Sequence, residues 1–233
     1  MPDTDDAALL DQQVDYYRAR APEYDRWWHR THQYELPPER KAEWDRDVAI
    51  LERWVDHQRP FGNVLELACG TGVWTGKLVD GADHITAVDS SPETIELNRQ
   101  KLNSERVDYV EADVFQWQPE PAAYDVAFFS FWISHVPPSA WAGFWDMVAA
   151  ALKPNGRAMF IDNRWAPRDW PPERPTGYVQ ERSDISSDGH TYSIVKRYLE
   201  PDELEAELAG LGWSGRTEAT PTFFVYGLAT PRP

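Results

Sequence analysis

The segment over residues 64–72, Val-Leu-Glu-Leu-Ala-Cys-Gly-Thr-Gly, constrains the fold of this 233-residue chain more than any other. Its apolar run over 64–68 predicts a buried strand, and a helix-compatible segment follows through Leu78. Gly70 and Gly72 permit a sharp turn between the two and let a ligand approach the backbone, because no Cβ stands in the way. A strand, a tight turn and a helix together form the repeating unit of a doubly wound α/β sheet.

A second apolar run ends in Asp89, seventeen residues after Gly72. An acidic residue at the tip of the second strand is placed to bind the two hydroxyl groups of a ribose. The glycine spacing is G-x-G-x-x-x-G, which differs from the dinucleotide fingerprint G-x-G-x-x-G, and Leu78 stands where a P-loop requires Ser or Thr. The pattern therefore predicts a cofactor that contains a nucleoside and binds without a P-loop.

Glu66 lies within the first strand and narrows the choice of cofactor. A carboxylate near the turn repels a pyrophosphate but could hold an ammonium group, directly or through water. S-adenosylmethionine carries an ammonium group and no phosphate. The pattern Glu66-x-Ala68-x-Gly70-x-Gly72, with Thr71 inside the turn, resembles the first motif of the class I S-adenosylmethionine-dependent methyltransferases. The alternative is a tight strand–helix turn that binds no ligand.

Strands and helices alternate along the chain in the order that a doubly wound sheet requires. We therefore predict an α/β fold with a mostly parallel, seven-stranded sheet and helices on both faces, the Rossmann-like fold that the resemblance also implies. A single domain over 1–233 is expected, with an N-terminal helical cap over 1–60 and an inserted, lid-like loop over 164–190. The predicted strands span 64–68, 85–88, 107–112, 124–130, 157–162, 192–198 and 223–229.

Two further segments are similar to motifs of the same family. Residues 111–114, Glu-Ala-Asp-Val, resemble its third motif, whose acid accepts a hydrogen bond from the adenine amino group, as Asp113 would here. At the end of the fourth strand, the resemblance implies that the main-chain carbonyl of Phe129 or Ser130 meets the methionine ammonium. Two further residues complete the predicted cofactor site. Ser90 follows Asp89, and Val114 follows Asp113.

The N-terminal stretch over residues 16–25 also resembles a pattern of this family, in which a tyrosine and an arginine close over the cofactor. Tyr17 and Arg20 are the candidates here, and Arg20 would hold the methionine carboxylate through a charge-assisted pair. The alternative is an amphipathic cap helix that makes no contact with the cofactor.

His135 follows the fourth strand, at the edge of the sheet where ligands bind in open α/β folds. A histidine accepts a proton readily near neutral pH, and a hydroxyl acceptor requires a base. We therefore expect O-methylation with His135 as the general base. The alternatives are that His135 only packs the turn before Pro137, that the acceptor is a small amine, or that the chain is a non-catalytic cofactor-binding regulatory protein.

The formal net charge is -16 and no run of Lys and Arg occurs, which disfavours a nucleic-acid acceptor and favours a small molecule. Among the basic residues near the insertion, Arg164, Arg168 and Arg174 could hold an acidic acceptor. No close spacing of His, Cys, Asp and Glu indicates a metal site, so no metal is expected.

Cys69 is the only cysteine, so no disulfide can form within the chain and a reducing compartment is expected. The sequence contains no apolar stretch of transmembrane length, and its first residues are acidic rather than signal-like. These features predict a cytoplasmic protein without membrane contact. The oligomeric state stays open, and a homodimer is compatible with the sequence.

Overall fold

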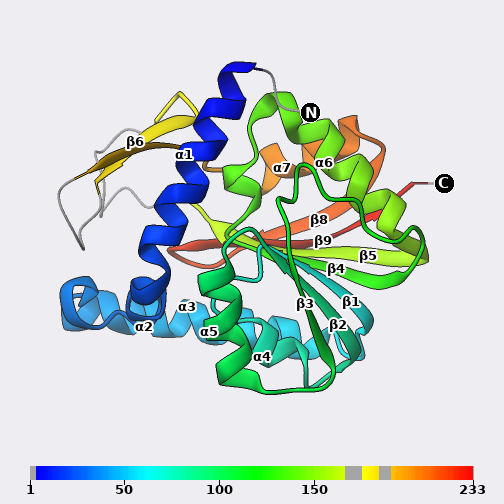
Figure 1. The fold of residues 1–233 in the computed structure, drawn as a ribbon, viewed down its shortest axis with the longest axis horizontal. Coiled ribbons are helices and arrows are strands. Elements are labelled where there is room, and N and C mark those ends of the chain that lie inside the picture. The colour runs from blue at the N-terminus through cyan, green and yellow to red at the C-terminus, as the bar shows by residue number, and fades with distance from the viewer. Residues whose placement is uncertain (1–3, 166–174, 184–189, 233) are drawn as a thin grey trace.

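A seven-stranded sheet in the order β3-β2-β1-β4-β5-β9-β8 forms the centre of the computed structural model, which describes residues 4–165, 175–183 and 190–232 (Figure 1). Strand β1 pairs in parallel with both β2 and β4, whereas β9 runs antiparallel to both of its neighbours. The predicted fold class is therefore confirmed. The strands are β1 (Gly62–Leu67), β2 (Ala82–Asp89), β3 (Val107–Glu111), β4 (Tyr124–Ser130), β5 (Leu152–Asn163), β8 (Trp213–Ala219) and β9 (Phe224–Pro231).

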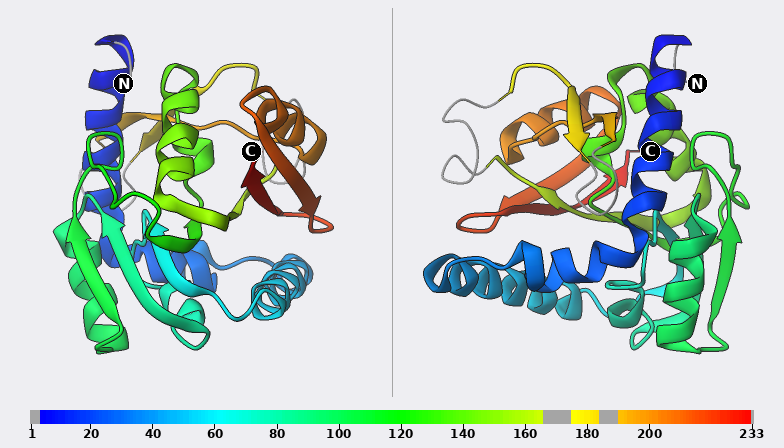
Figure 2. Two further views of the ribbon diagram at one scale, coloured as in Figure 1. Left: turned by 90° about the vertical axis from the view of Figure 1, so that its right-hand side faces the viewer. Right: turned by 60° about the vertical axis from the view of Figure 1, so that its left-hand side comes forward.

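Helices cover both faces of this sheet, as Figures 1 and 2 show. One face packs against α3 (Pro38–His57) and α4 (Thr75–Leu78), in a cluster that includes Trp44 and Leu51. The other face packs against α6 (Pro138–Ala151) and α7 (Pro201–Gly210), in a cluster that includes Trp145. The central strands are consequently apolar on both faces, as parallel strands between two helical layers must be. Helix α5 (Pro92–Leu102) joins β2 to β3, with Ser91 as its N-cap.

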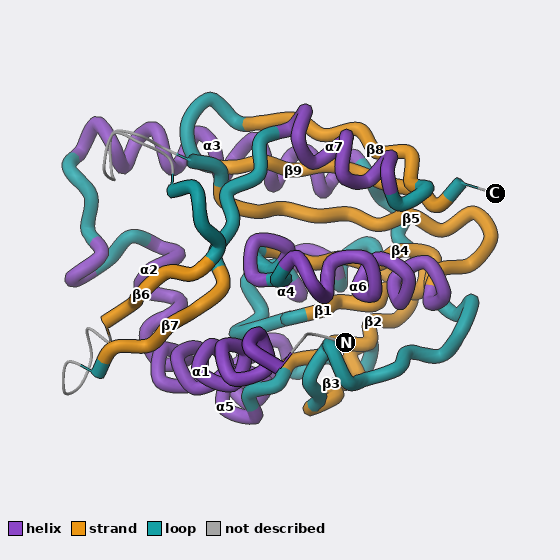
Figure 3. Tube along the Cα trace, turned by 90° about the horizontal axis from the view of Figure 1, so that it is seen from above, coloured by secondary structure: helices purple, strands orange, loops and turns teal. Residues whose placement is uncertain are grey.

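The N-terminal segment crosses the edge of the sheet at which the parallel strands end. It consists of α1 (Thr4–Arg20), the 3-10 turn η1 (Ala21–Glu23), α2 (Tyr24–His29) and η2 (His32–Tyr34). Helix α1 packs on a separate two-stranded sheet of β6 (Val179–Ser183) and β7 (Thr191–Val195), as seen from above in Figure 3. The side chain of Gln13 connects the two, because its Oε1 accepts from the Val195 amide at 3.0 Å.

The prediction that residues 192–198 form a strand of the central sheet is wrong. Residues 192–195 belong to β7, which pairs with β6 rather than with the central sheet and packs against α1, and residues 196–198 are not in a strand. The sixth strand of the central sheet is instead β8, which the sequence analysis missed. Strand β8 lies at the sheet edge and is mostly polar, so the apolar pattern of a buried strand is absent from it. Strand β6 falls within the segment expected to be an irregular loop.

None of the helices in the described ranges has both the length and the apolar character that crossing a membrane requires.

Asp47 fixes α3 against the loop between β8 and β9. Its side chain is fully buried, and its Oδ2 accepts from the Thr220 hydroxyl at 2.7 Å and from the amides of Thr222 and Phe223 at 2.9 Å each. The Thr220 hydroxyl also lies 3.3 Å from the Phe224 carbonyl oxygen, so removal of the carboxylate chiefly leaves the amides of Thr222 and Phe223 without an acceptor.

We expect Asp47→Ala to lower the free energy of unfolding by about 2–4 kcal/mol, because it leaves buried donors unpaired. Urea unfolding of the purified protein measures this loss. The control is Asp45→Ala on the same helix, whose side chain is 58% exposed and pairs with Lys41 at the surface. Asp45→Ala should cost less than about 1 kcal/mol. Equal losses in the two variants would contradict the role assigned to Asp47.

Candidate functional site

A cavity of about 820 Å³ opens at the carboxyl ends of β1, β2 and β4, between these strand ends, the N-terminal helices and the β6–β7 sheet. This is the position at which open α/β sheets bind ligands, and the volume suits a cofactor together with a small acceptor. The cavity brings together most of the residues that the sequence predicts for the site: Tyr17, Arg20, Ala68, Gly70, Asp89, Ser90, Asp113, Val114, Ser130 and His135.

The glycine turn and Asp89 form one rigid unit at this cavity. Gly70 has a φ of +52° and no atom within 4 Å of the place where a Cβ would stand, so its backbone faces open space. Its amide donates to Asp89 Oδ2 at 2.8 Å, and the Ser91 amide donates to Oδ1 at 2.9 Å. Each carboxylate oxygen keeps further accepting capacity. The unit can therefore accept the hydroxyl groups of a ribose beside a close-approaching backbone.

Four predicted residues do not line the cavity, but instead support the turn or the core: Glu66, Thr71, Gly72 and Phe129. The Thr71 hydroxyl donates to Asp25 Oδ1 at 2.6 Å, which ties the turn to α2. At Gly72 a Cβ would collide with the side chain of Asn98. Phe129 is fully buried in the core, so Ser130 is the one of that pair that lines the cavity.

Glu66 lies beneath the turn with 2% of its surface exposed. Burial raises the pKa of the Glu66 carboxyl to about 8, although a hydrogen bond with Thr75 acts to lower it. Its Oε2 has no hydrogen-bond partner among the described residues. The side chain is therefore neutral at neutral pH in this arrangement, and its contact with an ammonium group stays a prediction.

Asp113 lies at the cavity wall just after β3. Its Oδ1 accepts from the Phe115 amide at 2.9 Å and its Oδ2 from Gln116 Nε2 at 2.8 Å. These bonds hold the carboxylate in one orientation, in which it can accept from an amino group. Arg20 also lines the cavity, where it donates to the Tyr16 hydroxyl at 2.9 Å.

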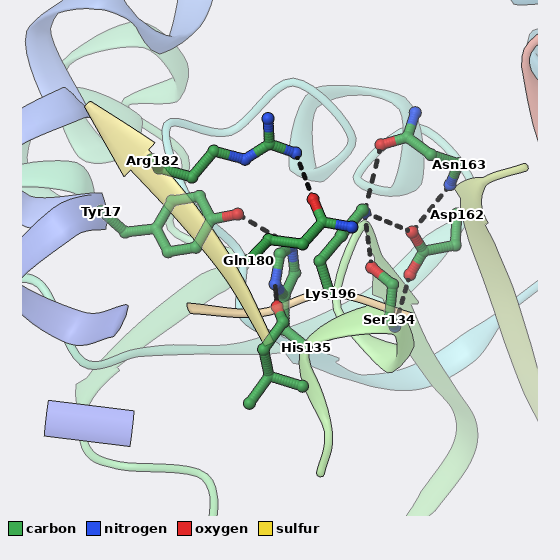
Figure 4. Close-up of polar contacts among 9 residues, drawn as sticks. Tyr17, Ser134, His135, Asp162, Asn163, Gln180, Arg182 and Lys196 are labelled. Atoms are coloured by element: carbon green, nitrogen blue, oxygen red, sulfur yellow. Dashed lines mark hydrogen bonds and ion pairs between the residues drawn. The ribbon is translucent and has the colours of Figure 1, made fainter. Parts of the chain in front are cut away.

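His135 ends the 3-10 turn η3 (Ile133–His135) and is only 4% exposed. Its Nδ1 lies 2.6 Å from the Val195 carbonyl oxygen, which can only accept, so Nδ1 carries the proton. Its Nε2 lies 2.8 Å from the Tyr17 hydroxyl and accepts from it (Figure 4). Burial above all, and then the charges of Lys196 and Arg182, hold the pKa of His135 well below its ordinary value. The imidazole is therefore neutral and presents a lone pair toward Tyr17.

Lys196 is a site residue that the sequence analysis missed. It follows Val195, is 5% exposed, and its Nζ donates to Ser134 Oγ at 2.7 Å and lies 3.4 Å from Asp162 Oδ1 (Figure 4). A lysine directly after the apolar pair Ile194-Val195 in a predicted strand is the signal that could have found it. A buried charge requires partners, and functional sites are where such groups gather.

Of the arginines proposed for an acidic acceptor, Arg164 lines the cavity and pairs with Glu200 at 2.8 Å. Arg168 and Arg174 lie outside the described residues. Over the described ranges, no three His, Cys, Asp or Glu side chains are arranged to hold a metal ion.

A family model described as a methyltransferase domain matches residues 64–156. Nodulation protein S of Rhizobium tropici is 34% identical over 64 residues, which is 27% of this chain and 27% of that protein. Demethylmenaquinone methyltransferase of Clavibacter sepedonicus is 30% identical over 100 residues, which is 42% of this chain and 40% of that protein. The chain thus aligns with less than half the length of either curated relative.

Solved structures match over nearly the whole chain. A DhpI–SAH complex is 32% identical, has a TM-score of 0.77, and the match covers 97% of this chain and 98% of that one. A complex of DhpI with SAM and HEP gives the same identity and score. The glycopeptide N-methyltransferase MtfA with S-adenosyl-L-homocysteine is 19% identical at a TM-score of 0.59, covers 78% of this chain and 86% of that one, and shares the fold alone. These comparisons bear out S-adenosylmethionine as the cofactor.

We expect Asp89→Ala to weaken binding of S-adenosylhomocysteine by about 1–3 kcal/mol, because ribose hydroxyls lose their acceptor. Calorimetric titration of the purified protein measures the change. The control is Asp108→Ala on neighbouring β3, whose side chain is 75% exposed and pairs with His84 at the surface. An unchanged affinity in Asp89→Ala would remove Asp89 from the cofactor site.

Glu66 makes the stability of the ligand-free protein depend on pH. The fold keeps its carboxyl protonated up to about pH 8, whereas the unfolded chain releases the proton above its ordinary value of 4.5. In that window the unfolded state binds fewer protons, so stability falls as pH rises.

We expect Glu66→Gln to gain at least about 1 kcal/mol of stability relative to the wild type between about pH 5 and about pH 8. Urea unfolding at both pH values measures this difference. Glu105→Gln, at an exposed position, is the control and should show no such gain. Parallel pH profiles for Glu66→Gln and the wild type would show that Glu66 is ionised in the fold.

Proposed function

The chain belongs to the class I S-adenosylmethionine-dependent methyltransferases, and from this premise we propose that it methylates a hydroxyl group of a small molecule, with His135 as the general base. The family follows from the 32% identity that extends over 97% of the chain and from the matching domain model. The hydroxyl acceptor and the base are proposals that the geometry of the cavity supports.

The residues present fit the cofactor. Gly70 leaves open space where a Cβ would stand, and Asp89 beside it would hold the ribose hydroxyls. Asp113 would accept from the adenine amino group, Arg20 would pair with the methionine carboxylate, and the Ser130 carbonyl would accept from the ammonium. When bound, S-adenosylmethionine supplies a methyl group on a positively charged sulfur, which keeps the electrons of the broken carbon–sulfur bond.

The observation that carries the proposed base is the contact between Tyr17 and His135. Nε2 is the unprotonated nitrogen of the ring, and the Tyr17 hydroxyl donates to it at 2.8 Å at the cavity wall. Burial raises the pKa of Tyr17, so this hydroxyl stays protonated and serves as a relay. A proton from the acceptor oxygen passes to Tyr17 while the Tyr17 proton passes to Nε2. With its proton removed in this way, the acceptor oxygen would have the free electron pair that methyl transfer requires.

The charges that act on His135 favour a hydroxyl over an amine as the acceptor. Lys196 and Arg182 both line the cavity, and both act on His135. An ammonium-bearing acceptor would meet like charges in a buried site, which is unfavourable. A hydroxyl acceptor carries no charge before its proton leaves, so it avoids that cost.

We expect His135→Gln to lower kcat by about 100-fold or more, because the acceptor proton loses its base. The assay measures formation of S-adenosylhomocysteine with a hydroxyl acceptor found by screening. His84→Gln, a half-exposed histidine at the surface, serves as the control. Cofactor affinity measured by calorimetry should stay the same in both variants. Full turnover in His135→Gln would refute the proposed base.

Tyr17→Phe tests the relay separately. It removes the hydroxyl that donates to Nε2 but keeps the ring, so we expect a loss of about tenfold or more in kcat. A kcat equal to that of the wild type would show that the acceptor reaches Nε2 without Tyr17.

A further inference from the structure

Tyr24 brings a hydroxyl group to the wall of the cavity. It is the first residue of α2, and its ring packs beside Trp27 with 5.4 Å between the ring centroids. Within the described part of the chain this hydroxyl has no hydrogen-bond partner, and its oxygen is not enclosed by protein atoms. The hydroxyls of other tyrosines at the cavity already have partners: Tyr16 with Arg20, Tyr17 with His135, and Tyr34 with Glu23. The Tyr24 hydroxyl is therefore open to a ligand that enters the cavity.

The position of this hydroxyl is fixed by the residues that follow Tyr24 in α2. Asp25 accepts from the Thr71 hydroxyl at 2.6 Å, which ties the start of the helix to the glycine turn. Trp28 is 6% exposed, and its carbonyl oxygen accepts from Trp44 Nε1 at 3.2 Å. A side chain supported in this way can recognise one ligand group in one orientation.

The groups that act on Tyr24 place it near both the cofactor end of the cavity and Tyr17. Burial above all raises the pKa of Tyr24, Arg20 lowers it, and Asp162 and Asp89 raise it further. Tyr24 in turn raises the pKa of Tyr17. Such charge effects weaken with distance, so Tyr24 lies in the neighbourhood of these groups. Because its pKa is raised overall, the Tyr24 hydroxyl keeps its proton at neutral pH and can donate it in a hydrogen bond.

The cofactor leaves Tyr24 to the acceptor. Its charged groups and its ribose already have proposed partners at the cavity: Arg20 for the carboxylate, the Ser130 carbonyl for the ammonium and Asp89 for the ribose hydroxyls. An acceptor hydroxyl that donates toward Tyr17 still has two lone pairs on its oxygen. One of them can accept from Tyr24, and the other remains for methyl transfer.

We propose that Tyr24 donates a hydrogen bond to the acceptor oxygen while that oxygen donates toward Tyr17, and that this contact selects a hydroxyl acceptor over an amine. A neutral amine has a single lone pair, so a nitrogen that accepts from Tyr24 has none left for methyl transfer. The acceptor oxygen gains negative charge as its proton leaves, which strengthens the bond from Tyr24. Tyr24 keeps its own proton throughout. This inference rests on the proposed function, because it assigns a further residue to the contact with the acceptor hydroxyl.

The first test measures binding without turnover and uses phenol and aniline as matched probes. The two have the same shape and carry no charge at neutral pH, and Trp27 and Phe131 offer aromatic surface beside Tyr24. Each is titrated by calorimetry into protein saturated with S-adenosylhomocysteine. We expect phenol to bind more tightly than aniline, and Tyr24→Phe to weaken phenol binding about fivefold and remove this preference.

The control is Tyr226→Phe on β9, whose hydroxyl donates to Glu218 at 3.2 Å outside the lining of the cavity. It should leave the binding of both probes unchanged. Affinity for S-adenosylhomocysteine is measured for every variant and shows whether the fold and the cofactor site survive. No saturable binding of phenol to the wild type, or equal binding of phenol to the wild type and Tyr24→Phe, would overturn the inference.

The second test measures turnover with the hydroxyl acceptor found by screening. At saturating S-adenosylmethionine, Tyr24→Phe should lower kcat/KM about tenfold or more, because the acceptor oxygen loses a donor as its charge develops. Its affinity for S-adenosylhomocysteine should equal that of the wild type. A tenfold weaker affinity would overturn the inference, since Tyr24 would then bind the cofactor.

The two proposals fail in different ways. An unchanged kcat/KM in Tyr24→Phe would overturn the inference and leave the proposed function standing. Where screening finds only amine acceptors, the proposed function fails, whereas weaker phenol binding by Tyr24→Phe still supports the contact between Tyr24 and a bound hydroxyl group.

Discussion

The parallel pairing of β1 with both β2 and β4 is the constraint on which the rest of the site depends. The chain winds outward from β1 in two directions, so the loops after β1, β2 and β4 separate at one edge of the sheet. Such a switch point leaves a crevice that no crossover helix covers. The glycine turn after β1 and Asp89 at the end of β2 meet there, because the Gly70 amide donates to the Asp89 carboxylate at 2.8 Å. One interaction of the chain therefore shapes the cofactor end of the cavity.

The other end of the cavity is closed by elements that do not belong to the sheet. Helix α1 lies against β7, and Gln13 contacts both the Val195 amide and the His135 carbonyl. Through these bonds the helix that carries Tyr17 is held above the turn that carries His135. The proposed cofactor half of the site thus rests on the central sheet, whereas the proposed acceptor half depends on the docking of α1 with the β6–β7 sheet. The two halves can change independently, which is how one fold serves many acceptors.

Burial gives the side chains at the acceptor end their chemistry. His135 is kept neutral and Tyr17 keeps its proton, both chiefly because burial disfavours their charged forms. Lys196 keeps a charge next to them with partial support from Asp162. Buried groups with shifted pKa values are typical of functional sites, because a packed protein interior otherwise excludes them. Of these groups, Lys196 is the charge whose burial lowers the stability of the ligand-free fold, whereas any ligand that binds only the folded protein raises that stability.

The sequence alone determined the fold class, the cofactor and most of the residues that line the cavity at the ends of the parallel strands. These follow from local patterns: an apolar strand, two glycines where the backbone needs a positive φ, and an acid at the next strand end. The sequence did not reveal that β8, a polar edge strand, completes the sheet, or that β7 leaves it. Only the tertiary structure decided the partners of His135, because Tyr17 on the one hand and Val195 and Lys196 on the other lie far from His135 in the chain. Their chemistry depends on burial and on charges brought together by packing, and no local pattern of residues encodes these.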